Sequence, residues 1–84
     1  MKVKIHITLK DGVLDPQGKA VGRALESLGF SGVTDVRQGK YIEIDLEETD
    51  INQARDNVDT MCRQLLANTV MENYNIEIKF NEKI

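Results

Sequence analysis

The sequence has few of the residues that cross-link or anchor small proteins. It contains one cysteine and no tryptophan among 84 residues, so no disulfide framework supports the fold, and the lone Cys62 is typical of a reducing compartment. Long apolar runs are also missing. Residues 1–10 alternate polar and apolar side chains, unlike a signal peptide or a membrane span. We therefore expect a soluble protein of the cytoplasm with no membrane partner.

Excess positive charge and metal ligands are scarce as well. Eleven basic and fourteen acidic side chains give a formal net charge of −3, so no positive field attracts phosphate backbones. We expect no nucleic-acid partner. His6 is the only histidine, and no second histidine or cysteine lies near it in the sequence. Because a metal site needs several such ligands, the sequence predicts none.

The short chain predicts self-association. Residues 1–84 are expected to form one domain, because no linker, repeat or low-complexity segment interrupts them. A domain of this size has a small apolar core that gives little net stability by itself. We therefore expect a homo-oligomer, either a dimer or a tetramer.

Hydrophobic periodicity predicts the element order βαββαβ. Strands are expected over residues 2–10, 33–38, 40–47 and 73–80, with helices over 16–28 and 51–68. Asp15 and Asp50 are the expected N-caps, and Gly29 is the expected left-handed C-cap of the first helix. The two middle strands read as a hairpin around Gly39. Both helices should cover one face of an antiparallel sheet, which is an α+β ferredoxin-like arrangement that dimerisation would complete or extend.

The side chains that could take part in catalysis lack a second catalytic residue that the sequence places beside them. Cys62 falls within the apolar stripe predicted for the second helix, which also includes Leu65 and Leu66, and a thiol in such a place usually packs and does not react. Glu43 and Asp45 lie on one strand face about 7 Å apart, and we expect them to pair with lysines of the neighbouring strand. The sequence therefore predicts no catalytic residue, no bound cofactor and no metal ligand on this chain.

The segment Asp15-Pro16-Gln17-Gly18 carries more than a helix start requires. Asp15 and Pro16 are favourable there, but a glycine inside a helix costs about 1 kcal/mol relative to alanine. The segment resembles the signature of PurS, the small subunit of phosphoribosylformylglycinamidine synthase. Two further blocks match in order: Val36-Arg37-Gln38-Gly39-Lys40, then Met61-Cys62 with Leu65-Leu66-Ala67-Asn68 and Glu72-Asn73-Tyr74. The family usually has proline where this chain has Thr69.

The resemblance implies a role as a subunit without chemistry of its own. The family's complex makes formylglycinamidine ribonucleotide for purine synthesis from formylglycinamide ribonucleotide, glutamine and ATP. A glutaminase subunit releases ammonia, and a large synthetase subunit uses ATP and Mg. By this analogy the chain would bridge these two partners and assist ammonia transfer. The alternative is a stand-alone ferredoxin-like module that binds a small ligand or regulates another protein.

Partner contacts are expected at two exposed turns of the chain, where recognition residues gather on a rigid scaffold. The helix-start signal leaves Gln17 and Gly18 unexplained, and Arg37 and Lys40 flank the expected hairpin glycine. The candidate contact residues are Asp15, Gln17, Gly18, Arg37, Gly39 and Lys40.

Overall fold

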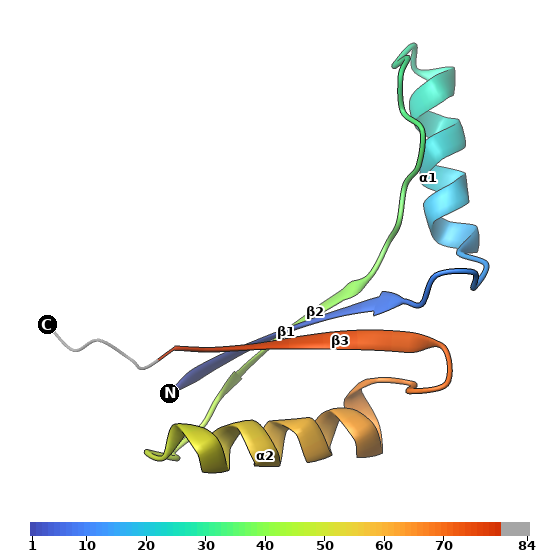
Figure 1. Cartoon of the computed structure of the whole chain (residues 1–84). Helices are drawn as coiled ribbons and strands as arrows, with labels where there is room; N and C mark the ends of the chain where they lie inside the picture. The colour runs from blue at the N-terminus through green and yellow to red at the C-terminus, as the bar shows by residue number, and fades with distance from the viewer. Residues whose placement is uncertain (80–84) are drawn as a thin grey trace, which may run out of the picture.

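The computed structural model describes residues 1–79 and has an α+β architecture (Figure 1). Its elements in chain order are β1 (Lys2–Leu9), α1 (Pro16–Ser27), β2 (Lys40–Asp45), α2 (Ile51–Met61), the π-helical turn η1 (Cys62–Leu66) and β3 (Glu72–Lys79). The strands form one antiparallel sheet in the order β2-β1-β3. The predicted α+β ferredoxin-like class is confirmed. Phe80, the last residue of the predicted final strand, lies outside the described residues.

The core lies between the sheet and α2. The central strand β1 contributes Val3, Ile5 and Ile7, all fully buried, because every second side chain of a strand points to the same face. From the helical side, α2 and η1 add Val58 and Cys62. Burial of one such aliphatic side chain contributes about 1.5–3 kcal/mol. This packing holds the sheet and α2 in one position relative to each other, and the rest of the chain extends from the sheet.

The turn η1 changes the direction of Leu65. In a regular α-helix, Cys62, Leu65 and Leu66 would share one face. The amide of Ala67 instead donates to the carbonyl oxygen of Cys62 at 2.9 Å, which is the wider i to i−5 bond of a π-helix. Leu65 is therefore 82% exposed, while Leu66 packs against the core. The prediction that Leu65 belongs to the buried stripe was wrong.

Helix α1 and residues 28–39 project from the sheet as an arm (Figure 1). The predicted ends of the helix are confirmed, since Asp15 caps its first turn and Gly29 adopts a φ of +94° after it. Residues 30–39 then return along α1 without strand pairing. The predicted strand over 33–38 and its hairpin with 40–47 are absent from the described structure. The strand β2 pairs with β1 instead.

The arm leaves apolar surface uncovered. We expected α1 to lie on the sheet beside α2, but Figure 1 shows it standing away from the sheet. Helix α1 has the predicted apolar stripe, but among the described residues no strand packs against it. The exposed large apolar side chains of the arm and of the turn before it are Leu14, Val21, Leu28, Phe30 and Val33. On the sheet, the side chains of Ile42, Ile44 and Leu46 on and after β2 are only partly buried.

A hydrogen bond joins a tyrosine of β3 to an aspartate of α2, and its contribution to the free energy of unfolding is lost at alkaline pH. The hydroxyl of Tyr74 donates to Asp59 Oδ1 at 2.5 Å, and Asp59 Oδ2 pairs with Arg63 Nε at 2.9 Å. The hydrogen bond to the Asp59 carboxylate raises the pKa of Tyr74. The neutral phenol thus stabilises the fold below the unfolded-state pKa of about 10, and this contribution is lost as pH rises through the higher folded-state pKa.

We therefore expect Tyr74→Phe to lower the free energy of unfolding at neutral pH and the difference from wild type to shrink above about pH 10. Urea denaturation of both proteins at a series of pH values between 7 and 11 measures this difference. Since both proteins share every other titrating group, a constant difference across the series would contradict the prediction.

Candidate functional site

The six predicted contact residues meet at the elbow, which we define as the junction between the arm and the sheet. A hollow of about 400 Å³ lies there, lined by Leu9, Asp15, Pro16, Gln17, Gln38, Gly39, Lys40 and Glu72. Two predicted residues that do not line it are bonded to residues that do. Gly18 donates its amide to Asp15, and Arg37 donates to the carbonyl of Leu9. Two separate stretches of sequence thus form one surface.

The carboxylate of Asp15 holds the two sides of the elbow together. Its Oδ1 accepts from the amide of Gly18 at 2.9 Å, in the first turn of α1. Its Oδ2 accepts from the amide of Gln38, also at 2.9 Å, on the returning segment. The backbone donors of Gln38 and then Gly18 lower the pKa of Asp15, because they stabilise the charged form. Asp15 is therefore both a helix cap and a tie across the elbow.

Arg37 forms a second connection between the arm and the sheet. Its Nη1 lies 2.7 Å from Asp11 Oδ1, in the turn that follows β1. Its Nη2 donates to the carbonyl oxygen of Leu9, at the end of β1. The planar guanidinium presents donors in a fixed fork, so one side chain reaches both acceptors. The returning segment is thereby attached to the strand from which the arm departs.

Two glycines allow the backbones at the elbow to approach closely. A Cβ at Gly18 would collide with the carbonyl oxygen of Val36. A Cβ at Gly39 would collide with the carbonyl oxygen of Ile7. Gly18 is also the one buried residue of α1. This close approach explains the glycine that the helix-start signal left unexplained.

Polar side chains remain accessible on the outside of the elbow. Lys40 Nζ lies 3.4 Å from Glu72 Oε1 and 3.4 Å from the carbonyl oxygen of Leu66. Glu72 also accepts the amide of Asn68 at 2.7 Å, which fixes the loop before β3. Gln17, Arg37 and Lys40 are exposed. No sequence signal indicated Glu72 as part of this site, because its proximity to Lys40 depends on the order of the strands.

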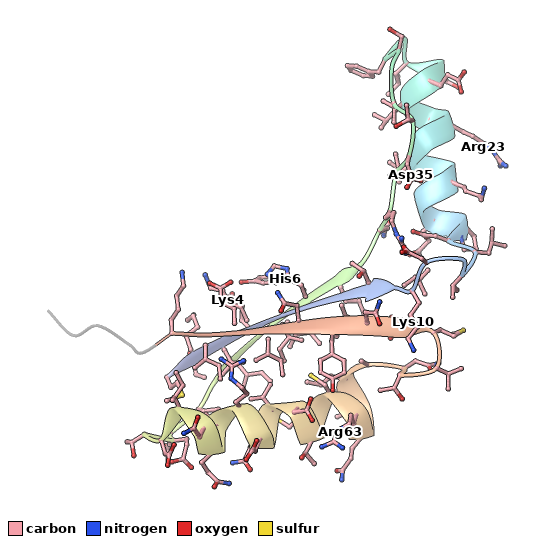
Figure 2. The ribbon with its side chains drawn as sticks, in the orientation of Figure 1. Lys4, His6, Lys10, Arg23, Asp35 and Arg63 are labelled. Atoms are coloured by element: carbon pink, nitrogen blue, oxygen red, sulfur yellow. The ribbon has the colours of Figure 1, made fainter. Side chains whose placement is uncertain are left out.

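The other reactive side chains lie apart from the elbow. His6 is on the open face of the sheet, where its ring centroid lies 4.9 Å from that of Tyr41. Lys2 Nζ lies 3.7 Å from Glu43 and 3.9 Å from Asp45, which confirms the predicted pairing of these carboxylates with a lysine of the neighbouring strand. Figure 2 shows His6 and Lys4 together on this face.

Cys62 occupies the core, as predicted. Its side chain is fully buried, and this burial raises the pKa of the thiol. A neutral buried thiol is a poor nucleophile. Within residues 1–79, no group of three or more His, Cys, Asp or Glu side chains is placed to hold a metal ion. Over the same residues, no helix is both long and apolar enough to cross a membrane.

The chain resembles known proteins over nearly all of its length. The family PurS, phosphoribosylformylglycinamidine (FGAM) synthase, matches residues 2–80. This chain belongs to the PurS family. It is 56% identical over 75 residues to the PurS subunit of FGAM synthase from Synechocystis sp., a match that covers 89% of this chain and 75% of that protein.

Solved PurS structures share the fold as well. Superposition on PurS of Methanocaldococcus jannaschii gives a TM-score of 0.88 at 41% identity, with 96% of this chain and 98% of that chain covered. A chain in the structure of PurLQS from Thermotoga maritima gives 0.82 at 32% identity, with 90% and 93% covered. The similarity thus extends over nearly the whole chain, including the arm.

Proposed function

We propose that this chain is the small, non-catalytic subunit of FGAM synthase in purine biosynthesis, and that it bridges the glutaminase subunit and the large ATP-dependent synthetase subunit. Membership of the PurS family over residues 2–80 carries the proposal. The similarity to a chain of the Thermotoga maritima PurLQS structure supports assembly with larger subunits. In this proposal ATP and Mg act at the synthetase subunit, and this chain binds neither.

Bridging has a chemical purpose in a reaction that moves ammonia between two sites. Ammonia released by hydrolysis of glutamine becomes protonated in water and then no longer acts as a nucleophile. Assembly that excludes water from the route between the sites prevents this loss. The chain would contribute rigid surface to that route, since its sheet and α2 form one packed unit and its elbow is internally bonded.

We propose further that the chain functions as a homo-oligomer of at least two copies. The arm exposes Leu28 at 73% and Phe30 at 58%, and the β2 side of the sheet has partly buried Ile42 and Ile44. A second copy could cover both surfaces reciprocally, as symmetric dimers do. Apolar area of this kind is favourable to remove from water.

Light scattering at micromolar concentration is expected to give a multiple of the 9.5 kDa chain mass. The double variant Leu28→Ser with Phe30→Ser should shift the protein toward the monomer. Leu65→Ser is the matched control, because Leu65 is equally apolar and 82% exposed but lies on η1, away from the arm. A monomeric wild type would overturn this part of the proposal.

The elbow is proposed as the surface that meets the larger subunits. Gln17, Arg37 and Lys40 would make the contacts, while Asp15, Gly18 and Gly39 shape the surface beneath them. We expect Gln17→Ala to weaken binding to the larger subunits by roughly three- to tenfold, which corresponds to one interfacial hydrogen bond. Calorimetric titration of this chain into the purified partners measures the change.

Gln64→Ala is the control for Gln17→Ala, since Gln64 is also exposed and helical but lies on η1. Both variants should keep the circular dichroism and the melting temperature of the wild type. Equal affinity of the wild type and Gln17→Ala would remove Gln17 from the contact surface. Saturable binding of a small metabolite to the isolated chain, without any affinity for the larger subunits, would favour the stand-alone module instead.

A further inference from the structure

The direction of the arm is not determined by packing against the sheet. Figure 2 shows Arg23 and Asp35 along the arm, well separated from Lys4 and His6 on the sheet. Within residues 1–79, the arm joins the sheet through residues 10–15 on the way out and through its own last residues, 36–39, on the way back. One of them contains Gly12 at a φ of +84°, and a Cβ built there would have no heavy atom within 4 Å apart from its chain neighbours. Connections of this kind do not by themselves fix the direction of the arm relative to the sheet.

The bonds at the elbow join these two segments. Asp15 stands at the end of the outgoing segment and accepts the amide of Gln38 on the returning segment at 2.9 Å. Arg37, on the returning segment, pairs with Asp11 on the outgoing one at 2.7 Å. Its second donor reaches the last residue of β1, Leu9. The ties therefore cross between the two segments and also fasten the returning segment to the sheet.

We infer that Asp15 is a positioning residue, which holds the arm in one direction relative to the sheet so that the subunits assembling with this chain meet a preformed surface. The inference rests on the proposed function, in which the arm and the elbow are covered on assembly. A preformed surface binds more tightly because the loss of conformational freedom has already occurred before binding. Arg37 supports the same geometry from the side of the sheet.

Asp15→Asn separates this role from helix capping. Asparagine and aspartate cap helices equally well, so the bond from Gly18 and the start of α1 should remain. The amide has one acceptor oxygen, and its NH₂ group donates only, so it cannot accept from Gly18 and Gln38 through two different oxygens. Asp35→Asn is the matched control, because it removes the same charge from the arm at an exposed position.

Two measurements on the full chain address the position of the arm directly. Hydrogen exchange by NMR should show the amide of Gln38 to be protected in the wild type and in Asp35→Asn, and to exchange at least about tenfold faster in Asp15→Asn. Residual dipolar couplings, measured with each protein also carrying Leu28→Ser and Phe30→Ser so that no second copy holds the arm, should report one orientation of α1 relative to β1 in the first two proteins and averaged couplings for α1 in the third. The circular dichroism of all three should agree.

The consequence for assembly is measured by titrating this chain into the glutaminase and synthetase subunits and following glutamine-dependent activity. Asp15→Asn should raise the half-saturating concentration by about tenfold, as expected from the loss of one charge-assisted hydrogen bond, and leave the plateau unchanged. Gln38→Pro deletes the donor N–H while keeping the Asp15 carboxylate, and it should give a similar increase. A direct contact between Asp15 and a partner would leave Gln38→Pro at the wild-type value.

The possible results distinguish failure of the positioning role of Asp15 from failure of the proposed function. Unchanged protection of Gln38 in Asp15→Asn would overturn the positioning role. Lost protection with an unchanged half-saturating concentration would show that assembly does not depend on the direction of the arm, which also overturns it. Failure of the wild type to stimulate activity would refute the proposed function, and the exchange and dipolar data would then decide alone whether Asp15 orients the arm.

Discussion

Omission of this chain from the reconstituted synthase is expected to lower glutamine-dependent synthesis by about tenfold or more, while synthesis from a high concentration of ammonium salt changes little. The proposed bridge raises the effective concentration of ammonia at the synthetase site. It takes no part in the activation of the substrate amide by ATP. Ammonia that enters from the solvent would therefore bypass the bridge, and the loss should be selective for one nitrogen source.

The experiment compares both nitrogen sources with and without the chain, at saturating ATP, Mg and formylglycinamide ribonucleotide and at one fixed pH. A fixed pH matters because it sets the fraction of unprotonated ammonia. The variant Gln64→Ala should restore glutamine-dependent synthesis as fully as the wild type, since it lies outside the elbow. An equal loss with both nitrogen sources would mean that the chain shapes the synthetase site, and the bridging mechanism would be wrong.

Features decided by neighbouring residues were predictable from the sequence. The cap at Asp15 and the left-handed Gly29 follow from the hydrogen-bonding and steric needs of helix ends. The alternation of Val3, Ile5 and Ile7 identified the buried face of β1, because a strand has a fixed period of two. These patterns also place the chain in its fold class without knowledge of distant contacts.

Features decided by distant residues were not predictable in this way. An extended segment that returns along a helix shows the same local pattern over residues 33–38 as a paired strand. Likewise, the apolar stripe of α1 identifies a face to be covered, but nothing in its spacing says whether the cover comes from the same chain. The exposure of Leu65 depends on a π-helical turn, which a 3.6-residue period does not reveal.

The roles of the candidate site residues were likewise only partly predictable from the sequence. Gly18 and Gly39 were selected because of a family signature, and their physical reason emerged only when the backbones of Val36 and Ile7 were seen beside them. The bond between Asp15 and Gln38 spans 23 positions of sequence. Helix-capping rules predict the bond from Gly18 to this carboxylate, but they do not predict the bond from Gln38. A functional surface built from two distant turns therefore needs the fold before its parts can be assigned roles.

The same substitution at two positions of α1 is expected to have opposite effects on stability. Gly18→Ala would place a Cβ against the carbonyl oxygen of Val36, a backbone atom that cannot rotate away. We expect a loss of about 1–3 kcal/mol, as for other overpacked sites. Gly22→Ala places its Cβ 3.6 Å from a methyl group of Val36, which is an ordinary contact. Alanine should therefore stabilise the helix there by up to about 1 kcal/mol.

Thermal unfolding at equal protein concentration tests this contrast, because the melting temperature of an oligomer depends on concentration. A change of 1 kcal/mol corresponds to about 4–8 °C in a domain of this size, so the expected difference in free energy of about 1–4 kcal/mol should separate the two melting temperatures by roughly 4–30 °C. Gly18→Ala should also deprotect the amide of Gln38, since the returning segment must move away from α1 to admit the methyl group. If both alanines stabilised the protein alike, the first turn of α1 would not approach Val36 closely in solution, and this close approach would be wrong as the reason for a glycine at position 18.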